Sequence, residues 1–290
     1  MSSGKDYLGS YRLIRLIRAG QICNIWEALK DGENERVAIK VLLATHAKRK
    51  EEIEQLRNEG RVGLIMDHPN VIRIFEFNDI GDVAFLVMQL FNARNLKQEL
   101  REDPETLAMN IPRVVSQCVD ALQYVNDKGW VHCDVKPDNF LVNEQGTIKL
   151  IDFSIARPLR QRRGLLSWRD KNIQGTRSYM APEQIRGKTL DARTDVYGFG
   201  CVAFELLSGR PPYSGSNPNE LLEKHLRAPV PGLQAANKHV TEDFATLVSR
   251  MLSKEPDKRP ANFGEVKKEL NRIKIFRAGK EPIIGKATAF

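Results

Sequence analysis

The chain has 290 residues, of which 41% are hydrophobic and 28% are charged. This composition predicts a globular protein with enough apolar residues for a core, and the length suits one large domain or two lobes. No apolar run approaches the ~20 residues that cross a bilayer, and the polar start of the chain does not resemble a signal peptide. We therefore expect no membrane partner.

The net charge of +8 would suit nucleic acid, an anionic membrane or acidic proteins. No nucleic-acid-binding motif accompanies the charge, so we expect no nucleic-acid partner. The four cysteines lie far apart and form no Cys-x-x-Cys pair: Cys23, Cys118, Cys133 and Cys201. Their spacing argues against a metal site or a disulfide framework and favours a reducing cytoplasm.

Alternating and β-branched residues predict an antiparallel sheet at the start of the chain. Strands are expected at 11–17, 25–29, 36–42, 71–77 and 83–89, because short turn segments separate these runs. A charged helix is expected between the third and fourth strands, at 47–66. Gly60 and Gly63 lie in this helix, where each costs about 1 kcal/mol relative to alanine.

The second half of the chain reads as mainly helical. A helix is expected to begin at 96–100, a second covers 111–128 before Gly129, and a third, apolar helix follows Asp195. The basic stretch 157–171 has little periodicity and predicts an exposed, mobile loop. Nothing after about Arg277 reads as a folded element, so 276–290 is predicted to be a flexible tail.

The stretch 132–152 carries acidic groups in unlike settings. Asp134 and Asn139 lie beside Pro137 and Asp138, which favour a loop. Asp152 follows a β-branched run that predicts a short strand. Two carboxylates and an amide in this pattern suit Mg²⁺ and phosphate chemistry, because Mg²⁺ takes oxygen ligands.

These residues resemble the signature of protein kinases, in which an aspartate, an asparagine five residues later and an Asp-Phe pair follow in order. The resemblance covers roughly residues 8 to 275 and is closest to bacterial serine/threonine kinases. The matching motifs are Val37-Ala38-Ile39-Lys40, His132-Cys133-Asp134 with Lys136 and Asn139, Asp152-Phe153, Gly175-Thr176 and Ala181-Pro182-Glu183.

The resemblance implies an α+β, two-lobed protein kinase fold. Its N-lobe, residues 1–89, would contain a five-stranded antiparallel sheet and one helix. Its C-lobe, residues 90–275, would be mainly helical and contain the catalytic loop and an activation segment at 152–183. The family also pairs Glu183 with Arg259 and braces the catalytic loop with Asp195.

The implied activity is a serine/threonine protein kinase that uses ATP and Mg²⁺ and acts on protein hydroxyls. Asp134, Lys136 and Asn139 would be catalytic, with Asn139 and Asp152 holding the metal. Lys40, paired with Glu59, would bind the α- and β-phosphates, and Thr176 would line the acceptor pocket. The other expected nucleotide-binding residues, with Met88 as gatekeeper and 89–91 as hinge, are Ile17, Gly20, Ile25, Ala38, Met88, Gln89, Phe91 and Leu141.

Several positions depart from the family pattern. The glycine loop holds Arg18, Gly20 and Cys23, and side chains at 18 and 23 could cost ~1–2 kcal/mol of strain; returning both to glycine is expected to tighten ATP binding. Cys133 replaces an arginine, so phosphorylation of Ser167 or Thr176 should not switch activity on. Ser154 replaces a glycine.

Three other expectations follow from these departures and from the net charge. Gly63 stands where kinases have a bulky residue, which predicts a loosely docked helix. A pseudokinase, that is, an ATP-binding or interaction scaffold with little turnover, is the alternative function. A nucleic-acid-binding module is the third.

Overall fold

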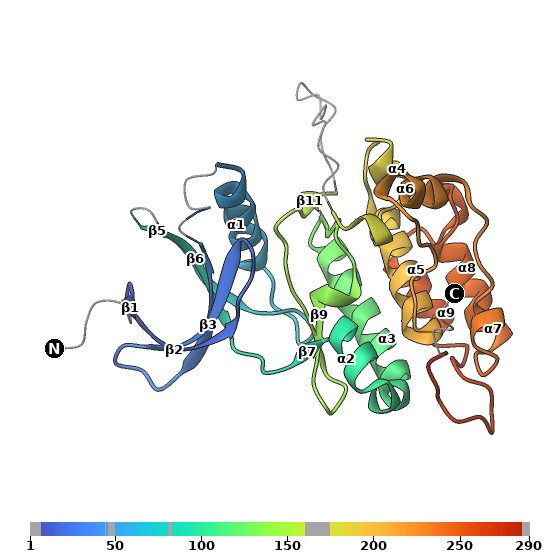
Figure 1. The fold of residues 1–290 in the computed structure, drawn as a ribbon, viewed down its shortest axis with the longest axis horizontal. Helices are drawn as coiled ribbons and strands as arrows, with labels where there is room; N and C mark the ends of the chain where they lie inside the picture. Colours follow the sequence, from blue (N-terminus) through green and yellow to red (C-terminus); the bar gives the residue numbers. More distant parts are fainter. Residues whose placement is uncertain (1–6, 44, 46–49, 81–82, 160–174, 286–290) are drawn as a thin grey trace. The chain divides into compact units, whose positions relative to one another are not determined.

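The computed structural model describes residues 7–43, 45, 50–80, 83–159 and 175–285. The chain divides into two compact units: an N-terminal unit of residues 1–92 and 151–154, and a C-terminal unit of residues 93–150 and 155–290. The first is built on an antiparallel sheet, and the second is mainly helical (Figure 1). This α+β architecture confirms the predicted fold class.

The sheet of the N-terminal unit has six strands in the order β1-β2-β3-β4-β6-β5, and all neighbours are antiparallel. Five strands were expected. The additional strand is β1, whose two residues are too few to show an alternating pattern. The strands are β1 (Tyr7–Leu8), β2 (Tyr11–Arg18), β3 (Cys23–Lys30), β4 (Arg36–Leu42), β5 (Ile74–Ile80) and β6 (Val83–Gln89).

Alternation along β4 gives the sheet two apolar faces. Val37 and Ile39 pack on one face with Phe85 and Val87 of β6. Ala38 and Leu42 belong to the opposite cluster, which also takes in α1 through Leu56. Because successive side chains of a strand point to opposite faces, one strand serves both layers. Lys40 lies on β4 between Ala38 and Leu42 and shares their face.

Helix α1 (Lys50–Gly63) packs against β5 and β6 through its two glycines. A Cβ on Gly60 would lie 2.8 Å from Phe77 Cβ, and one on Gly63 would lie 2.2 Å from Ile74 Cδ1. Both distances are far below a van der Waals contact, so only glycine permits this approach. The expectation of a loosely docked helix is therefore wrong, because Ile74 fills the space that a side chain at 63 would occupy.

The C-terminal unit is arranged around α5, whose residues are buried over almost its whole length. Its first turn is capped by Asp191, whose side chain accepts from Arg193 N–H, and it ends at Gly209, where φ is +76°. The apolar run that predicted this helix is fully buried because other helices surround it. The helices are α2 (Leu96–Glu102), α3 (Pro104–Asp127), α4 (Pro182–Ile185), α5 (Ala192–Ser208), α6 (Pro218–Arg227), α7 (Leu233–Ala236), α8 (Glu242–Met251) and α9 (Phe263–Leu270).

Short strands position the two ends of the loop that carries Asp134. Strand β8 pairs with β11 before the loop, and β9 pairs with β10 and β7 after it. The strands are β7 (Arg94–Asn95), β8 (Trp130–Val131), β9 (Phe140–Val142), β10 (Ile148–Leu150) and β11 (Arg157–Pro158), and short 3₁₀ turns lie at Pro137–Asn139, Arg177–Tyr179 and Pro256–Lys258.

The end of the chain differs from the expected flexible tail over residues 276–285. Arg277 N–H donates to His239 O at 2.8 Å, and Gly285 N–H donates to Leu207 O at 2.8 Å. Asn237 Nδ2 donates to both Leu207 O and Ile283 O, at 2.9 and 2.8 Å. These bonds fix the segment against the end of α5 without any regular element, so no periodic pattern could reveal it.

Two further expectations concern a membrane span and the basic loop at 157–171. Within the described part of the chain, no helix combines the length and the hydropathy that a membrane span requires. Most of the basic loop, including Ser167, lies outside the described residues, as do residues 286–290 of the predicted tail.

Candidate active site

The residues predicted for the site fall into both units. The structure brings Lys40, Glu59 and Asp152 together in the N-terminal unit, and Asp134, Lys136 and Asn139 together in the C-terminal unit. Of the predicted nucleotide-binding residues, Leu141 lies in the C-terminal unit, on β9. The others lie in the N-terminal unit: Ile17, Gly20, Ile25, Ala38, Met88, Gln89 and Phe91.

A buried ion pair joins the sheet of the N-terminal unit to α1. Lys40 Nζ on β4 lies 2.6 Å from Glu59 Oε2 on α1 and 3.9 Å from Asp152 Oδ1. Burial by itself lowers the pKa of Lys40, but the charges of Asp152 and Glu59 outweigh it and raise that pKa above its usual value. Lys40 therefore carries its positive charge at any physiological pH and is suited to bind an anion.

Asp152 has an unusual backbone for a residue with a Cβ. Its φ is +69°, in the left-handed region, and such a conformation costs ~1–2 kcal/mol. Ser154 N–H donates to Asp152 Oδ1 at 3.2 Å, which fixes the carboxylate in a local turn. Such strain persists only where the surroundings over-determine the conformation, so neighbouring contacts must hold this residue in place.

Expected nucleotide-binding residues occupy adjacent strands of the sheet. Ala38 pairs with Met88 between β4 and β6, and Ile25 pairs with Lys40 between β3 and β4. Gln89 N–H donates to Arg73 O at 2.8 Å, so that donor is already used within the unit. A backbone bond from Gln89 to adenine would therefore have to use the carbonyl oxygen.

The loop between β2 and β3 differs from the expectation of strain. Arg18 ends β2 and Cys23 begins β3, and neither has a positive φ. The strain predicted for side chains at these positions is therefore absent. Glycine is required at position 20 alone among the three, because a Cβ there would lie 2.4 Å from Cys23 O. Ile17, the penultimate residue of β2, is 39% exposed.

Asp134 lies at the centre of the cluster in the C-terminal unit. Lys136 Nζ donates to Asp134 Oδ2 at 2.6 Å and to Thr176 Oγ1 at 2.7 Å. Thr176 N–H donates to the other carboxylate oxygen, Oδ1, at 3.0 Å. Asn139 Nδ2 donates to Asp134 O at 2.8 Å and to Oδ2 at 3.2 Å. The carboxylate is thus oriented from three sides, and one of its partners is a cation.

The loop that carries Asp134 is braced through its backbone. Asp195, buried in α5, accepts from His132 N–H at 2.7 Å and from Cys133 N–H at 2.9 Å. Cys133 has a φ of +67°, a second left-handed residue with a Cβ. Burial raises the pKa of the Cys133 thiol well above its usual value, so the side chain stays neutral. The bracing therefore depends on the backbone at 133 and not on its side chain.

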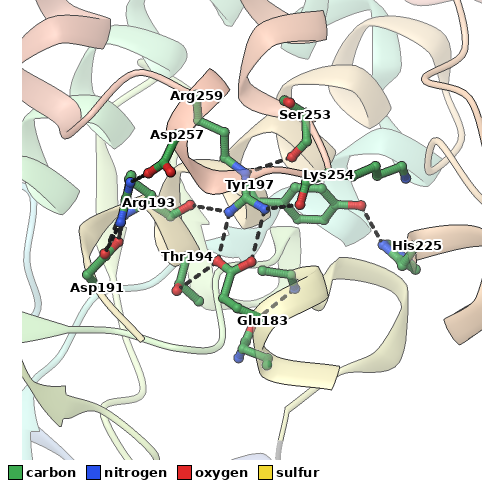
Figure 2. A network of polar contacts seen from close by, with 12 residues as sticks. Glu183, Asp191, Arg193, Thr194, Tyr197, His225, Ser253, Lys254, Asp257 and Arg259 are labelled. Atoms are coloured by element: carbon green, nitrogen blue, oxygen red, sulfur yellow. Dashed lines mark hydrogen bonds and ion pairs between the residues drawn. The ribbon is translucent and has the colours of Figure 1, made fainter. Parts of the chain in front are cut away.

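The segment that follows Thr176 is anchored by a buried network, which Figure 2 shows. Arg259 donates to both carboxylate oxygens of Glu183, at 2.7 and 2.9 Å, and Thr194 Oγ1 donates to one of them at 3.0 Å. The Arg259 guanidinium also lies 4.8 Å from the centre of the Tyr197 ring. The predicted pairing of Glu183 with Arg259 is present.

The same network continues to a buried histidine that the sequence did not single out. Tyr197 OH and His225 Nδ1 are 2.9 Å apart, and the Tyr213 ring lies edge-on to His225 at 5.0 Å (Figure 2 shows Tyr197 and His225). Burial lowers the pKa of His225 to about 4, and the charge of Lys254 adds to the effect. His225 is therefore neutral at pH 7.

Two further polar contacts escaped sequence analysis. Asn58 Nδ2 on α1 donates to Phe153 O at 3.0 Å and to Ser154 O at 3.1 Å. In the C-terminal unit, buried Glu205 accepts from Tyr179 OH at 2.7 Å and pairs with Lys97. None of these residues interrupts a helical or strand pattern, and each acts at long range. The position of Asn58 directly before Glu59 was the one available signal.

Comparison with known proteins places this geometry in a family. The protein kinase domain family matches residues 11–270. The chain is 32% identical over 289 residues to the serine/threonine-protein kinase PknA of Mycobacterium tuberculosis, covering 96% of this chain and 64% of that protein. It is 30% identical over 256 residues to PrkC of Bacillus subtilis, covering 88% of this chain and 39% of PrkC.

A third relative is a probable serine/threonine-protein kinase, pknA2, of Bifidobacterium longum, 28% identical over 291 residues. That match covers 97% of this chain and 38% of the relative. The chain thus spans between 38% and 64% of the length of these relatives. The family match covers most of the chain and agrees with the motifs and the fold. The chain belongs to the protein kinase domain family, among the bacterial, eukaryotic-like serine/threonine kinases.

Proposed function

We propose that this protein transfers the γ-phosphoryl group of ATP to serine or threonine hydroxyls of protein substrates. The observation that carries the proposal is the position of Lys136, whose Nζ lies 2.6 Å from Asp134 Oδ2 and 2.7 Å from Thr176 Oγ1. A carboxylate beside an ammonium group and a hydroxyl side chain can accept a proton from a substrate hydroxyl while the ammonium offsets phosphoryl charge.

Each residue of the C-terminal cluster has a proposed role. Asp134 orients the acceptor hydroxyl and takes its proton as the oxygen attacks. Lys136 balances the negative charge of the transferred group, and it is already held beside Asp134. Asn139 orients Asp134 through its Nδ2. The Oδ1 of the Asn139 amide is then the oxygen that a cation can bind.

The N-terminal unit supplies the charged groups for a nucleotide. Lys40, positioned by Glu59, binds the α- and β-phosphates, and the Asp152 carboxylate is the acidic ligand for Mg²⁺. These oxygen donors fit Mg²⁺, which typically takes one or two carboxylates plus substrate phosphates. Bound Mg²⁺·ATP supplies the phosphoryl group and part of the charge neutralisation. The proposed remaining nucleotide contacts are Ile17, Gly20, Ile25, Ala38, Met88, Gln89, Phe91 and Leu141.

The wider setting is proposed as follows. Residues 1–89 and 90–275 form the two kinase lobes, with the activation segment at 152–183. The reaction takes place in the cytoplasm, where ATP is supplied; the four widely spaced, free cysteines are compatible with a reducing compartment. The partners are ATP and a protein with a serine or threonine acceptor, and no nucleic acid.

A scaffold that binds ATP with little turnover is the second candidate. It is favoured by the loop between β2 and β3, where only Gly20 remains and Arg18 and Cys23 occupy strand positions. Such a loop presents fewer backbone N–H groups to phosphate than a glycine-rich turn does. The two candidates differ in turnover and not in binding.

The test measures phosphoryl transfer and nucleotide binding on the same preparations. Radiolabelled ATP is supplied with a generic protein substrate, with Mg²⁺ or with EDTA, to wild type and to Asp134→Asn. We expect Mg²⁺-dependent labelling by wild type, and none above background by Asp134→Asn, with ATP affinity in calorimetry changed less than a few-fold. Asp152→Asn should in addition weaken Mg²⁺-dependent binding.

Two results would contradict the proposal in different ways. Asp134→Asn activity within a few-fold of wild type would remove the assigned proton acceptor. Wild type that binds Mg²⁺·ATP but labels neither substrate nor itself would establish the scaffold instead.

A further inference from the structure

One side chain of α1 hydrogen-bonds to the backbone that directly follows Asp152. Asn58 Nδ2 donates to Phe153 O at 3.0 Å and to Ser154 O at 3.1 Å, so both hydrogens of a single amide group bind consecutive carbonyls. All of these residues belong to the N-terminal unit. The bonds cross 95 and 96 residues of sequence, so they are tertiary contacts and not part of a local turn.

The orientation of this amide is set by a second residue of the same helix. Arg61 Nη2 donates to Asn58 Oδ1 at 2.6 Å. A guanidinium can only donate, so the atom it contacts must be the amide oxygen, and the NH₂ group must face Phe153 and Ser154. Asn58 is therefore fixed as a donor toward the segment that carries Asp152.

That segment needs external support because Asp152 is in the left-handed region, with a φ of +69°. A residue with a Cβ stays there only where its surroundings over-determine the backbone. The Ser154 N–H bond to Asp152 Oδ1 fixes the side chain, whereas Asn58 fixes the two carbonyls that follow. Together they define both ends of the turn.

The same helix also holds the charged side of the cluster. Glu59, the next residue, binds Lys40 at 2.6 Å, and Lys40 lies 3.9 Å from Asp152. Gly60 and Gly63 set the helix directly on β5 and β6, because any Cβ there would overlap Phe77 or Ile74. A displacement of α1 would therefore move Asn58 and Glu59 at once.

We infer that Asn58 is a positioning residue for Asp152. By donating to Phe153 O and Ser154 O it keeps Asp152 in its left-handed conformation, with its carboxylate toward Lys40 and ready to bind Mg²⁺. This inference rests on the proposed role of Asp152 as a metal ligand. Its consequence is specific: loss of the Asn58 donors should weaken the Mg²⁺-dependent part of nucleotide binding and leave the Mg²⁺-independent part unchanged.

The test uses Asn58→Asp, which keeps the size and the Arg61 partner but replaces two N–H donors with an acceptor. Asn58→Ala is the second variant, in which water can bind the freed carbonyls, and it serves if the carboxylate prevents folding. Arg57→Ala, on the exposed side of the same helix, is the control. ATP binding is measured by calorimetry with Mg²⁺ and with EDTA, and hydrogen exchange is followed at 151–155.

We expect Asn58→Asp to weaken ATP binding about tenfold in Mg²⁺, or about 1.4 kcal/mol, and less than twofold in EDTA. Exchange at 151–155 should accelerate in Asn58→Asp and Asn58→Ala but not in Arg57→Ala. Equal weakening with Mg²⁺ and with EDTA would show a merely structural role, and unchanged binding in Mg²⁺ would also overturn the inference.

Failure of the proposed kinase activity has a different signature. A wild type that binds Mg²⁺·ATP without transferring phosphate still permits every comparison above, because binding and exchange are measured instead of turnover. A wild type whose ATP binding is the same in Mg²⁺ and EDTA removes the metal role of Asp152; accelerated exchange confined to the Asn58 variants would then still show the positioning of the segment.

Discussion

The loop between β2 and β3 and the loop that carries Asp134 contain similar departures from the kinase pattern but are held very differently. The first is exposed, and its Gly20 N–H donates to Asn24 Oδ1 at 3.3 Å. The second is largely buried: the Asp195 side chain of α5 accepts from its backbone N–H groups, and Thr176 N–H donates to its carboxylate.

The difference shows how each loop accommodates a changed residue. Arg18 and Cys23 fit because the chain there simply continues as strand. Cys133 fits because Asp195 binds its backbone N–H, a contact that does not involve the side chain, and its backbone is left-handed. A loop braced through its backbone can lose a side chain and keep its shape, whereas an unbraced loop changes shape.

The variant with the largest expected effect removes the bracing of the loop that carries Asp134. Asp195→Ala leaves the buried N–H groups of His132 and Cys133 without their acceptor, and each such loss costs about 1–3 kcal/mol. We expect a loss of about 3–5 kcal/mol in the free energy of unfolding, measured by urea denaturation, and loss of phosphoryl transfer. Asp191→Ala, which removes the cap of the same helix and the partly exposed ion pair with Arg193, should cost about 1–2 kcal/mol. Equal losses in the two variants would refute the bracing.

The second prediction tests whether the buried network beyond the loop is sensitive to acid. The pKa of His225 falls from 6.5 to about 4 in the folded state, so folding favours the neutral ring. The contribution of the neutral His225 ring to the free energy of unfolding is fully present above pH 6.5. It is lost as the pH falls from 6.5 through 4, by up to about 3 kcal/mol.

Thermal unfolding from pH 7.5 to 4 measures this loss. The gap in stability between wild type and His225→Gln should narrow as the pH falls, because only wild type must protonate a buried imidazole. Parallel curves for the two proteins would exclude His225 as the titrating group.

The third prediction concerns activation by phosphorylation, given that Cys133 stands where kinases have an arginine. A phosphorylated loop residue needs a fixed cation to order it, and Cys133 is neutral and buried. Exhaustive phosphatase treatment should therefore reduce activity less than tenfold, which corresponds to about 1.4 kcal/mol. This applies to phosphate on Thr176 and on Ser167, the latter outside the described residues. A larger loss would mean that another cation takes the place of the arginine.

The smallest expected effect concerns the exposed loop. Because Arg18 and Cys23 carry no left-handed backbone strain, changing both to glycine has no strain to release. ATP affinity in calorimetry should not improve, and glycine in strand ends should lower stability by about 0.5–1 kcal/mol per site. Tightening of ATP binding by 1–2 kcal/mol would show that the side chains at 18 and 23 do strain the loop.

Much of the fold followed from patterns that a sequence displays locally. The alternation at Val37–Ile39 and the apolar run after Asp195 reflect burial on one or both faces, and burial leaves a periodic trace. The pairing of Lys40 with Glu59 was expected from the family resemblance, and the structure places them 2.6 Å apart. Their roles toward a nucleotide remain predictions.

The parts that escaped prediction are bonds between a side chain and a distant backbone or side chain. Asn58 reaches Phe153 O, and Gly285 N–H reaches Leu207 O, yet neither residue breaks a local pattern. The fit of Gly63 against Ile74 was misjudged for the same reason, because the shape of the partner is not visible in the helix itself.

The distribution of thiols makes the exposed loop addressable by chemistry. Cys118, Cys133 and Cys201 are buried, while Cys23 is partly exposed at the start of β3. Burial raises the pKa of Cys23 to about 11, so its thiolate is scarce at neutral pH and coupling to an alkylating fluorophore should need alkaline buffer. A single dye could thus be attached to the folded wild-type chain beside Gly20, and its emission would report entry of the proposed nucleotide without any engineered cysteine.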